Sequence, residues 1–284
     1  MYGGDPKMEQ FIEETKRTGQ QILNVTTKTA DVTAKTAAAV DILAKLQRTQ
    51  FRYTASKAST SRKGDDFKKK LEKFYENTPD EEMKLRCMLL DIKLPKTLVT
   101  GAHLFKYCWH GHINTLLGLK PREINNPRNG LLLFKPLEYA YDDSRFAINC
   151  KDGDDGPVFF MVLLDTGLKH VKVWDFAVHH NLTKGYSVEQ LDPKVSTITF
   201  GDLDGTELVL SNKHHHPYKR SLAFQAMMAT ERAVEEEWQP ANRPPMEILS
   251  CISLEAKVNF DAWLEMAAHA PPPMATESLD DDDE

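Results

Sequence analysis

Residues 98–148 read LVTGAHLFKYCWHGHINTLLGLKPREINNPRNGLLLFKPLEYAYDDSRFAI, and this stretch decides the fold. Small and β-branched residues over 96–103 predict a strand that ends at a histidine. Turn-forming residues at 125–129 precede the short apolar run 130–134, which predicts a second strand. Pro136 then favours the first turn of a helix. The predicted order is strand, long loop, strand and helix, which brings a histidine and an asparagine to one point.

Three short motifs in this stretch carry a resemblance to a known family. They read Ala102-His103-Leu104, then the nine residues from Asn125 to Leu133, then Glu138-Tyr139-Ala140-Tyr141-Asp142. The chain resembles the ββα-metal (HNH) nuclease superfamily, in the branch whose motifs are Ala-His-Leu/Ile, Asn-Asp/Asn-Pro-Arg-Asn-Gly-Leu-Leu-Leu and His-x-x-Phe-Asp. The nine-residue motif is the most specific. The resemblance covers roughly residues 85–230 and implies phosphodiester hydrolysis, with DNA favoured over RNA as the partner.

The third motif departs from the family pattern. Glu138 stands where the family usually carries its last histidine, and Tyr141 replaces phenylalanine. Because glutamate binds hard cations through oxygen whereas histidine suits zinc, the exchange favours Mg²⁺ or Mn²⁺ over Zn²⁺ as the divalent metal cofactor. The exchange is equally consistent with a loss of catalysis.

By resemblance, His103 and Asn129 are the catalytic residues and Glu138 is a metal ligand. An imidazole with a pKa near its usual value of about 6.5 can take a proton from water at neutral pH, so His103 is the candidate base. Ala102 cannot supply a second ligand beside the base. The remaining candidates are Asp142, one helical turn after Glu138, and His110 or His112 in the loop. The alternative is structural: a core histidine, an asparagine in a turn and an exposed helical glutamate.

The long loop also offers groups that suit nucleic acid. Lys120, Arg122 and Arg128 are candidates for contacts with phosphates, and Tyr107 and Trp109 are candidates for stacking on bases. Solvated loop cations are the alternative interpretation. The basic segment 57–73 has the same two interpretations, since lysines opposite an apolar helix face are commonly solvated.

Composition limits the class of protein. The chain has 284 residues, of which 41% are hydrophobic and 9% aromatic, enough for a globular core. The net charge of −6 argues against indiscriminate nucleic-acid binding, although the acid is concentrated in 231–237 and 280–284. Neither a membrane-spanning run nor an apolar signal core is evident, so a soluble intracellular protein that does not bind membranes is expected. Four scattered cysteines favour reduced thiols.

The predicted fold class is α+β: a ββα-metal nuclease core with extra strands and a C-terminal helix, preceded by a long N-terminal helix. Residues 1–64 form a helical segment and linker, 65–239 the HNH-like domain, and 240–284 an extension with a disordered acidic tail. Apolar residues spaced by three and four over 7–50 are consistent with either a coiled coil that joins two copies or a solvated helix.

Further elements are predicted around the core. Helices are expected over 66–77, 217–237 and 256–266, strands over 85–94, 158–164 and 170–178, and a hairpin over 195–200 and 207–210. His214, His215 and His216 are interpreted as an exposed connector, because consecutive side chains point in different directions.

Three functions follow. The first is a metal-dependent HNH-type endonuclease acting on DNA. The second is a catalytically inactive, nuclease-derived module that binds nucleic acid or assembles proteins. The third is a coiled-coil adaptor.

Overall fold

The computed structural model describes residues 64–212, 214–240, 242 and 244–251, together with Arg17, Thr26 and Thr27, which are helical and exposed. The chain divides into two compact units, one of residues 51–262 and the other of residues 1–50 with 263–284. All the elements below lie in the first unit. The other predicted parts of the helix over 7–50, the helix over 256–266 and the acidic tail lie outside the described residues.

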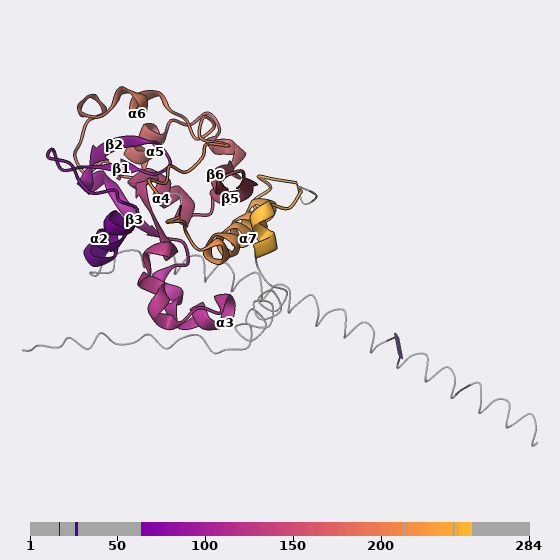
Figure 1. The fold of residues 1–284 in the computed structure, drawn as a ribbon. Coiled ribbons are helices and arrows are strands. Elements are labelled where there is room, and N and C mark those ends of the chain that lie inside the picture. Colours follow the sequence, from indigo (N-terminus) through magenta and orange to yellow (C-terminus); the bar gives the residue numbers. More distant parts are fainter. Residues whose placement is uncertain are drawn as a thin grey trace, which may run out of the picture. The chain divides into compact units, whose positions relative to one another are not determined.

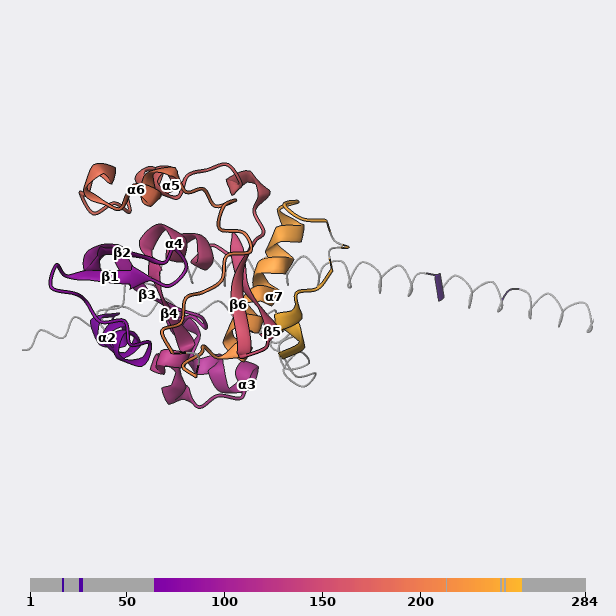
Figure 2. The same cartoon turned by 45° about the horizontal axis from the view of Figure 1, so that its top comes forward.

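The centre of the fold is an antiparallel hairpin followed by a helix. Strand β3 (Val99–His103) pairs with β4 (Gly130–Phe134), so that Val99 lies opposite Phe134 and His103 opposite Gly130. Helix α4 (Lys135–Asp142) follows at once, with a proline in its first turn. The predicted order of strand, loop, strand and helix is confirmed. Figures 1 and 2 show this hairpin between α4 and the preceding helix α2 (Gly64–Phe74).

Helix α2 packs closely on the hairpin backbone because two glycines make room for it. A Cβ atom at Gly101 would lie 2.9 Å from the Leu71 side chain, and one at Gly130 would lie 2.5 Å from the Phe67 ring. Phe67, Leu71 and Tyr75 are all buried. The helix predicted over 66–77 is confirmed, with its bounds at 64–74.

The loop between β3 and β4 consists of short helical turns. They are η3 (Tyr107–His112), α3 (Ile113–Leu117), η4 (Pro121–Asn125) and η5 (Pro127–Asn129). Gly118 ends α3 in the left-handed region, with φ of 62°, where glycine is favoured.

Two further hairpins flank this core. They are β1 (Lys84–Cys87) with β2 (Ile92–Pro95), and β5 (Phe146–Gly153) with β6 (Gly156–Leu163). The single strand predicted over 85–94 is wrong, because the chain turns back through Asp91, whose φ is 56°. The turn still places this segment on the core, since the Met88 amide donates to the Leu132 carbonyl oxygen at 2.9 Å. The strand predicted over 158–164 is confirmed as β6.

Two other predicted β elements are wrong. Residues 170–178 contain α5 (Val173–His179), whose buried residues Val173, Trp174, Phe176 and Ala177 follow helical spacing. The hairpin over 195–200 and 207–210 is replaced by α6 (Pro193–Thr197) and turns, because Asp192 caps the helix and Pro193 suits its first position. Only isolated bridges at Lys172–Thr199 and Phe160–Glu207 join these segments to other described residues as β structure.

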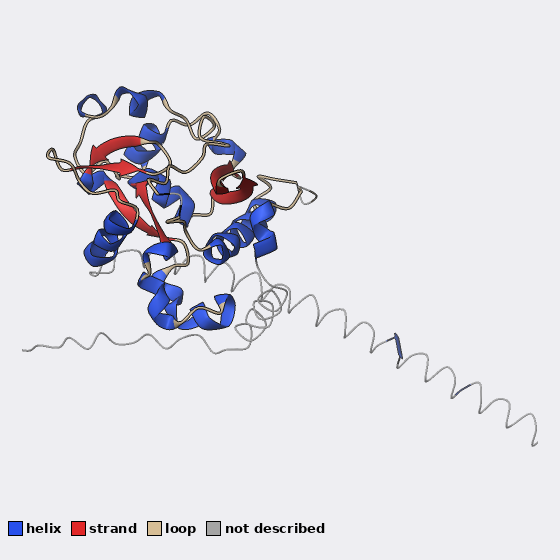
Figure 3. Ribbon diagram, in the orientation of Figure 1, coloured by secondary structure: helices blue, strands red, loops and turns tan. Residues whose placement is uncertain are grey.

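The predicted C-terminal helix is confirmed as α7 (Lys219–Glu235), which contacts β5 and η8 (Glu247–Cys251). Figure 3 shows the small red strands surrounded by blue helices, as expected for an α+β domain. The other short turns are η2 (Lys96–Leu98), η6 (Thr166–Leu168) and η7 (Val188–Gln190). No helix in the described part of the chain has the length and apolarity needed to cross a bilayer.

Candidate active site

His103 lies at the end of β3 and is held on two sides. Its ring stacks on Phe67 of α2, with centroids 3.8 Å apart and planes 10° apart. Its Nε2 atom lies 3.1 Å from Oδ1 of Asn125. Because an amide oxygen only accepts hydrogen bonds, Nε2 carries the hydrogen and Nδ1 keeps a lone pair. Burial lowers the pKa of His103 to about 4, although the bond to Asn125 opposes this shift. The imidazole is therefore neutral at pH 7.

Asn129 is fully buried and fixes the loop. Its Nδ2 atom donates to the carbonyl oxygens of Phe105 at 3.0 Å and Ile124 at 2.9 Å, while its Oδ1 atom accepts from the Phe105 amide at 3.0 Å. It thereby joins the two ends of the loop beside the base. The amide that bonds to the imidazole belongs to Asn125, which sequence reasoning did not select. The only sequence signal for Asn125 was its place at the start of the nine-residue motif.

Glu138 and Asp142 lie one turn apart on α4 and form a half-buried acidic pair. Burial, followed by the charge of Asp142, raises the pKa of Glu138 well above its usual range. Burial likewise raises the pKa of Asp142, and the nearby Lys106 ammonium opposes that shift. Lys106 Nζ lies 3.8 Å from Asp142 Oδ1, and only 11% of the Lys106 side chain is exposed. The structure therefore brings Glu138 and Asp142 together with a cation supplied by the chain itself.

The base and the acidic pair lie on different faces of the hairpin. His103 stacks on α2, and side chains alternate along a strand, so Ala102 points to the opposite face. Figures 1 and 2 place α4 on that opposite side of the hairpin. Ala102 offers α4 no ligating atom, as the sequence predicts.

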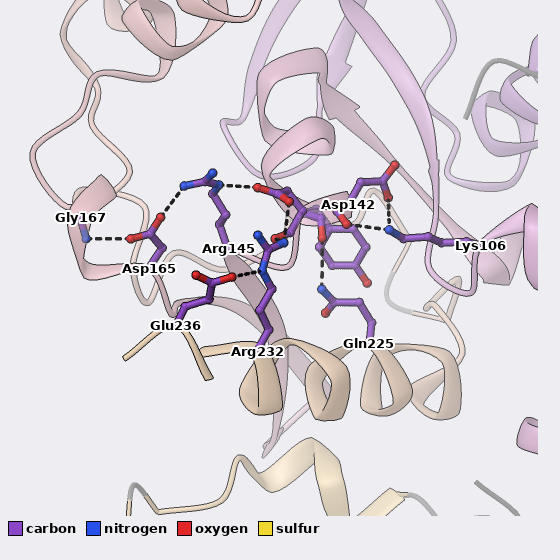
Figure 4. A network of polar contacts seen from close by, with 10 residues as sticks. Lys106, Asp142, Arg145, Asp165, Gly167, Gln225, Arg232 and Glu236 are labelled. Carbon is purple, nitrogen blue, oxygen red and sulfur yellow. Dashed lines mark hydrogen bonds and ion pairs between the residues drawn. The ribbon is translucent and has the colours of Figure 1, made fainter. Parts of the chain in front are cut away.

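The last carbonyl groups of α4 are satisfied by side chains from distant elements (Figure 4). Tyr141 O accepts from Gln225 at 3.3 Å, Asp142 O from Lys106 at 2.6 Å, and Asp143 O from Arg232 at 2.6 Å. Positive charges at the C-terminus of a helix also interact favourably with the helix dipole. The loop after β3 and helix α7 thus fix the end of α4 that carries Asp142.

Arg145 extends this polar network away from the helix end. Its guanidinium donates to Asp143 and to Asp165, each at 2.7 Å. Asp165 in turn accepts from the Gly167 amide at 2.8 Å, which holds the turn after β6 (Figure 4).

Two residues predicted to contact nucleic acid have partners within the protein. Trp109 is only 6% exposed and packs against Phe105 and Phe224, so it does not offer a stacking face to bases. Arg128 is half-buried, donates to the His216 carbonyl oxygen at 3.2 Å and lies 4.6 Å over the Tyr218 ring. Both side chains pack the loop against the chain around α7.

The other predicted residues of the loop lie at the surface. Lys120 and Arg122 are exposed, and their contact with phosphates stays a prediction. His112 is also exposed, in η3. Among the three adjacent histidines, His215 stacks on Phe74 and His216 on Phe159, so they take different partners.

One comparison with known families found a match. Residues 87–149 match the family model described as HNH endonuclease. Residues 87–149 are an HNH endonuclease domain. The match contains β3, β4 and α4 with His103, Asn129 and Glu138. Comparisons with curated proteins and with solved structures gave no match.

HNH endonucleases typically use a divalent metal ion. Within the described residues, no three histidine, cysteine or acidic side chains are grouped to hold a metal. Glu138 and Asp142 alone provide two carboxylates, and Mg²⁺ is commonly held by one or two carboxylates with water and substrate phosphates. Zinc usually requires three or four protein ligands. The donors of this HNH domain therefore fit a hard cation in their chemistry and do not fit zinc.

Proposed function

We propose that the HNH domain is a metal-dependent endonuclease that hydrolyses phosphodiester bonds in DNA, with His103 as the general base. The observation that carries this proposal is the state of the His103 ring. It is neutral, and its bond to Asn125 leaves the Nδ1 lone pair to accept a proton. A buried titratable group with a strongly shifted pKa and a specific partner is typical of functional sites.

In the proposed reaction, a water oxygen forms a bond to phosphorus while the bond to the leaving oxygen breaks. His103 Nδ1 takes the proton of the attacking water and becomes imidazolium, and the leaving oxygen takes a proton from solvent. A negative phosphate nearby favours the imidazolium and raises the pKa of His103 above the low value of the free protein. Asn125 holds the ring plane during this transfer.

Glu138 and Asp142, on the other face of the hairpin from His103, are the carboxylates that would hold a divalent cation. When bound, such a cation would supply positive charge that neutralises the phosphate. The exposed Lys120 and Arg122 would contact neighbouring phosphates, which makes binding weaker as salt is raised.

A second candidate is an inactive, nuclease-derived module that binds nucleic acid or assembles proteins. Three observations favour it. The candidate base and the acidic pair lie on different faces of the hairpin. Lys106 lies beside Asp142, where the endonuclease proposal places a metal ion, and Phe67 covers one face of the His103 ring.

Self-association through the N-terminal helix stays a prediction. Comparing the mass in solution of the full chain with that of a chain lacking residues 1–60 tests it, and an unchanged mass excludes that helix as the assembling element.

Plasmid cleavage separates the two candidates. The wild type, His103→Gln and His179→Gln are incubated with Mg²⁺, Mn²⁺, Zn²⁺ or a chelator. His179 is a matched control because it is an exposed histidine at the end of α5. We expect cleavage with Mg²⁺ or Mn²⁺ only, a loss of about 100-fold or more in His103→Gln, and no change in His179→Gln. Equal cleavage by the wild type and His103→Gln would reject His103 as the base. Salt-dependent DNA binding without cleavage would favour the second candidate.

A further inference from the structure

Phe67 reaches the candidate base from outside the HNH domain. Helix α2 spans Gly64–Phe74, whereas the family match begins at residue 87. The Phe67 side chain is 2% exposed, and its ring lies parallel to the His103 imidazole at 3.8 Å. A Cβ atom at residue 130 would lie 2.5 Å from Phe67 Cζ, so the ring fits only because that residue is glycine. The hairpin and α2 are therefore complementary in shape beside His103, the candidate base.

Helix α2 is anchored by polar bonds from three residues that follow Phe67. Lys68 Nζ donates to the Lys96 carbonyl oxygen at 2.6 Å. Tyr75, just beyond the helix, donates its hydroxyl to the Gly130 carbonyl oxygen at 2.9 Å. Glu72 pairs with Lys96 at 2.9 Å. These bonds hold the helix, and with it the Phe67 ring, in a fixed place over the hairpin.

We propose that Phe67 is a positioning residue for His103, which makes α2 part of the active site although it lies outside the HNH domain. The phenyl ring fixes the plane of the imidazole, so that Nε2 points at Asn125 and Nδ1 is left for the attacking water. It also keeps water from one face of the ring. This inference rests on the proposed function, because a positioned base matters only for a reaction.

Phe67 can position His103 because the imidazole ring of a histidine is otherwise free to rotate. The torsion that turns the imidazole is broad and nearly two-fold, so the backbone alone does not decide which nitrogen faces Asn125. A parallel aromatic ring at contact distance fixes the plane of the imidazole, and the bond to Asn125 then decides which nitrogen faces the amide. Exclusion of water by the same ring disfavours the charged imidazolium, which agrees with the lowered pKa of His103.

Titration of His103 by NMR tests the inference without any substrate. The variants are Phe67→Leu and Phe67→Met, with Phe74→Leu as a matched control, since Phe74 lies on the same helix and stacks on His215 instead. His103→Gln assigns the signal. We expect the His103 pKa to rise from about 4 by about one unit or more in both Phe67 variants and to stay unchanged in Phe74→Leu. The acidic limb of the cleavage rate against pH should move by the same amount, with a lower kcat and an unchanged KM.

A folded Phe67→Leu with the wild-type His103 pKa and pH profile would overturn the inference. If both Phe67 variants fail to fold, the ring-current shifts of the His103 ring protons in the wild type decide it. Upfield-shifted protons support the parallel stack on Phe67, whereas unshifted protons overturn it. A wild type that cleaves no nucleic acid under any metal condition refutes the proposed function alone, because the titration and the ring-current shifts still report whether Phe67 holds the ring.

Discussion

The Lys106 ammonium joins the loop after β3 to the end of α4, because its Nζ atom donates to the Asp142 carbonyl oxygen at 2.6 Å and lies 3.8 Å from the Asp142 carboxylate (Figure 4). It also lies 5.4 Å over the Trp109 ring. A lysine that is almost completely buried in this way acts as an internal counter-ion for the acidic pair of α4.

Replacing that counter-ion should destabilise the domain and strengthen metal binding. Lys106→Met keeps the apolar stem but leaves the half-buried pair of Glu138 and Asp142 without its cation, so we expect a loss of about 2 kcal/mol in the free energy of unfolding at pH 7. Urea denaturation measures it. Mn²⁺ should then raise the urea midpoint more in Lys106→Met than in the wild type. Lys93→Met is the control, since Lys93 forms an exposed pair with Asp80 and should change little. Equal Mn²⁺ effects in wild type and Lys106→Met would contradict the counter-ion role.

His103 should make stability depend on pH in a defined window. Its pKa is about 4 in the folded protein and about 6.5 in an unfolded chain, so the unfolded chain binds more protons between these values. The free energy of unfolding should be unaffected by His103 above pH about 6.5 and fall as pH falls toward about 4, by up to about 3 kcal/mol. Urea midpoints across this range measure the effect. His103→Gln should flatten that part of the curve, and an identical slope in the variant would show that other groups cause it.

Replacing Asn129 should lower the stability of the domain. Asn129→Ala removes an amide that makes three buried hydrogen bonds and leaves the main-chain groups of Phe105 and Ile124 without their partner. We expect a loss of about 3 kcal/mol in the free energy of unfolding, measured with urea. Asn126→Ala is the comparison, because the half-buried Asn126 side chain accepts one bond from the Arg128 amide at 3.0 Å and donates one to the Glu123 carboxylate at 2.7 Å. Its loss should cost about 1 kcal/mol. A smaller loss for Asn129→Ala than for Asn126→Ala would contradict this account.

Gly130→Ala should separate α2 from the hairpin. The added methyl group would lie 2.5 Å from Phe67 Cζ and 2.9 Å from the Ala102 carbonyl oxygen, so one of them must move. We expect a loss of about 1–3 kcal/mol in stability, with a rise in the His103 pKa like that of the Phe67 variants. Urea denaturation and NMR measure the two effects. Phe67→Leu combined with Gly130→Ala should cost less than the sum of the single changes, because the clash is partly relieved. Full additivity would mean that the ring is not the obstacle.

The sequence was sufficient for the centre of the fold because its signals are local. Turn formers before the run 130–134 and a proline at 136 mark the limits of β4 and α4 without any knowledge of the rest of the chain. The segment 170–178 was misassigned because a short apolar run suits a strand as well as a buried helix face. Trp109 looked available because it lies in a loop, and only its contacts with Phe105 and Phe224 show that it is covered.

The candidate site was predictable only in part, for a similar reason. His103, Asn129 and Glu138 were found by motif, whereas the groups that determine the behaviour of His103 depend on long-range packing. Phe67 precedes His103 by 36 residues and Asn125 follows it by 22. Separations of this length follow neither helix nor strand periodicity, so the sequence alone does not reveal these contacts.

The way α4 ends limits how the HNH domain can be produced as a separate fragment. Gln225 and Arg232, which satisfy its final carbonyl groups, lie more than 70 residues beyond the last residue of the family match. A recombinant fragment trimmed to 87–149 would leave those oxygens bare and would also discard Phe67. The smallest fragment that folds by itself should therefore begin before α2 and extend through α7. A fusion protein that contains only residues 87–149 would carry the motif without the helices that support it.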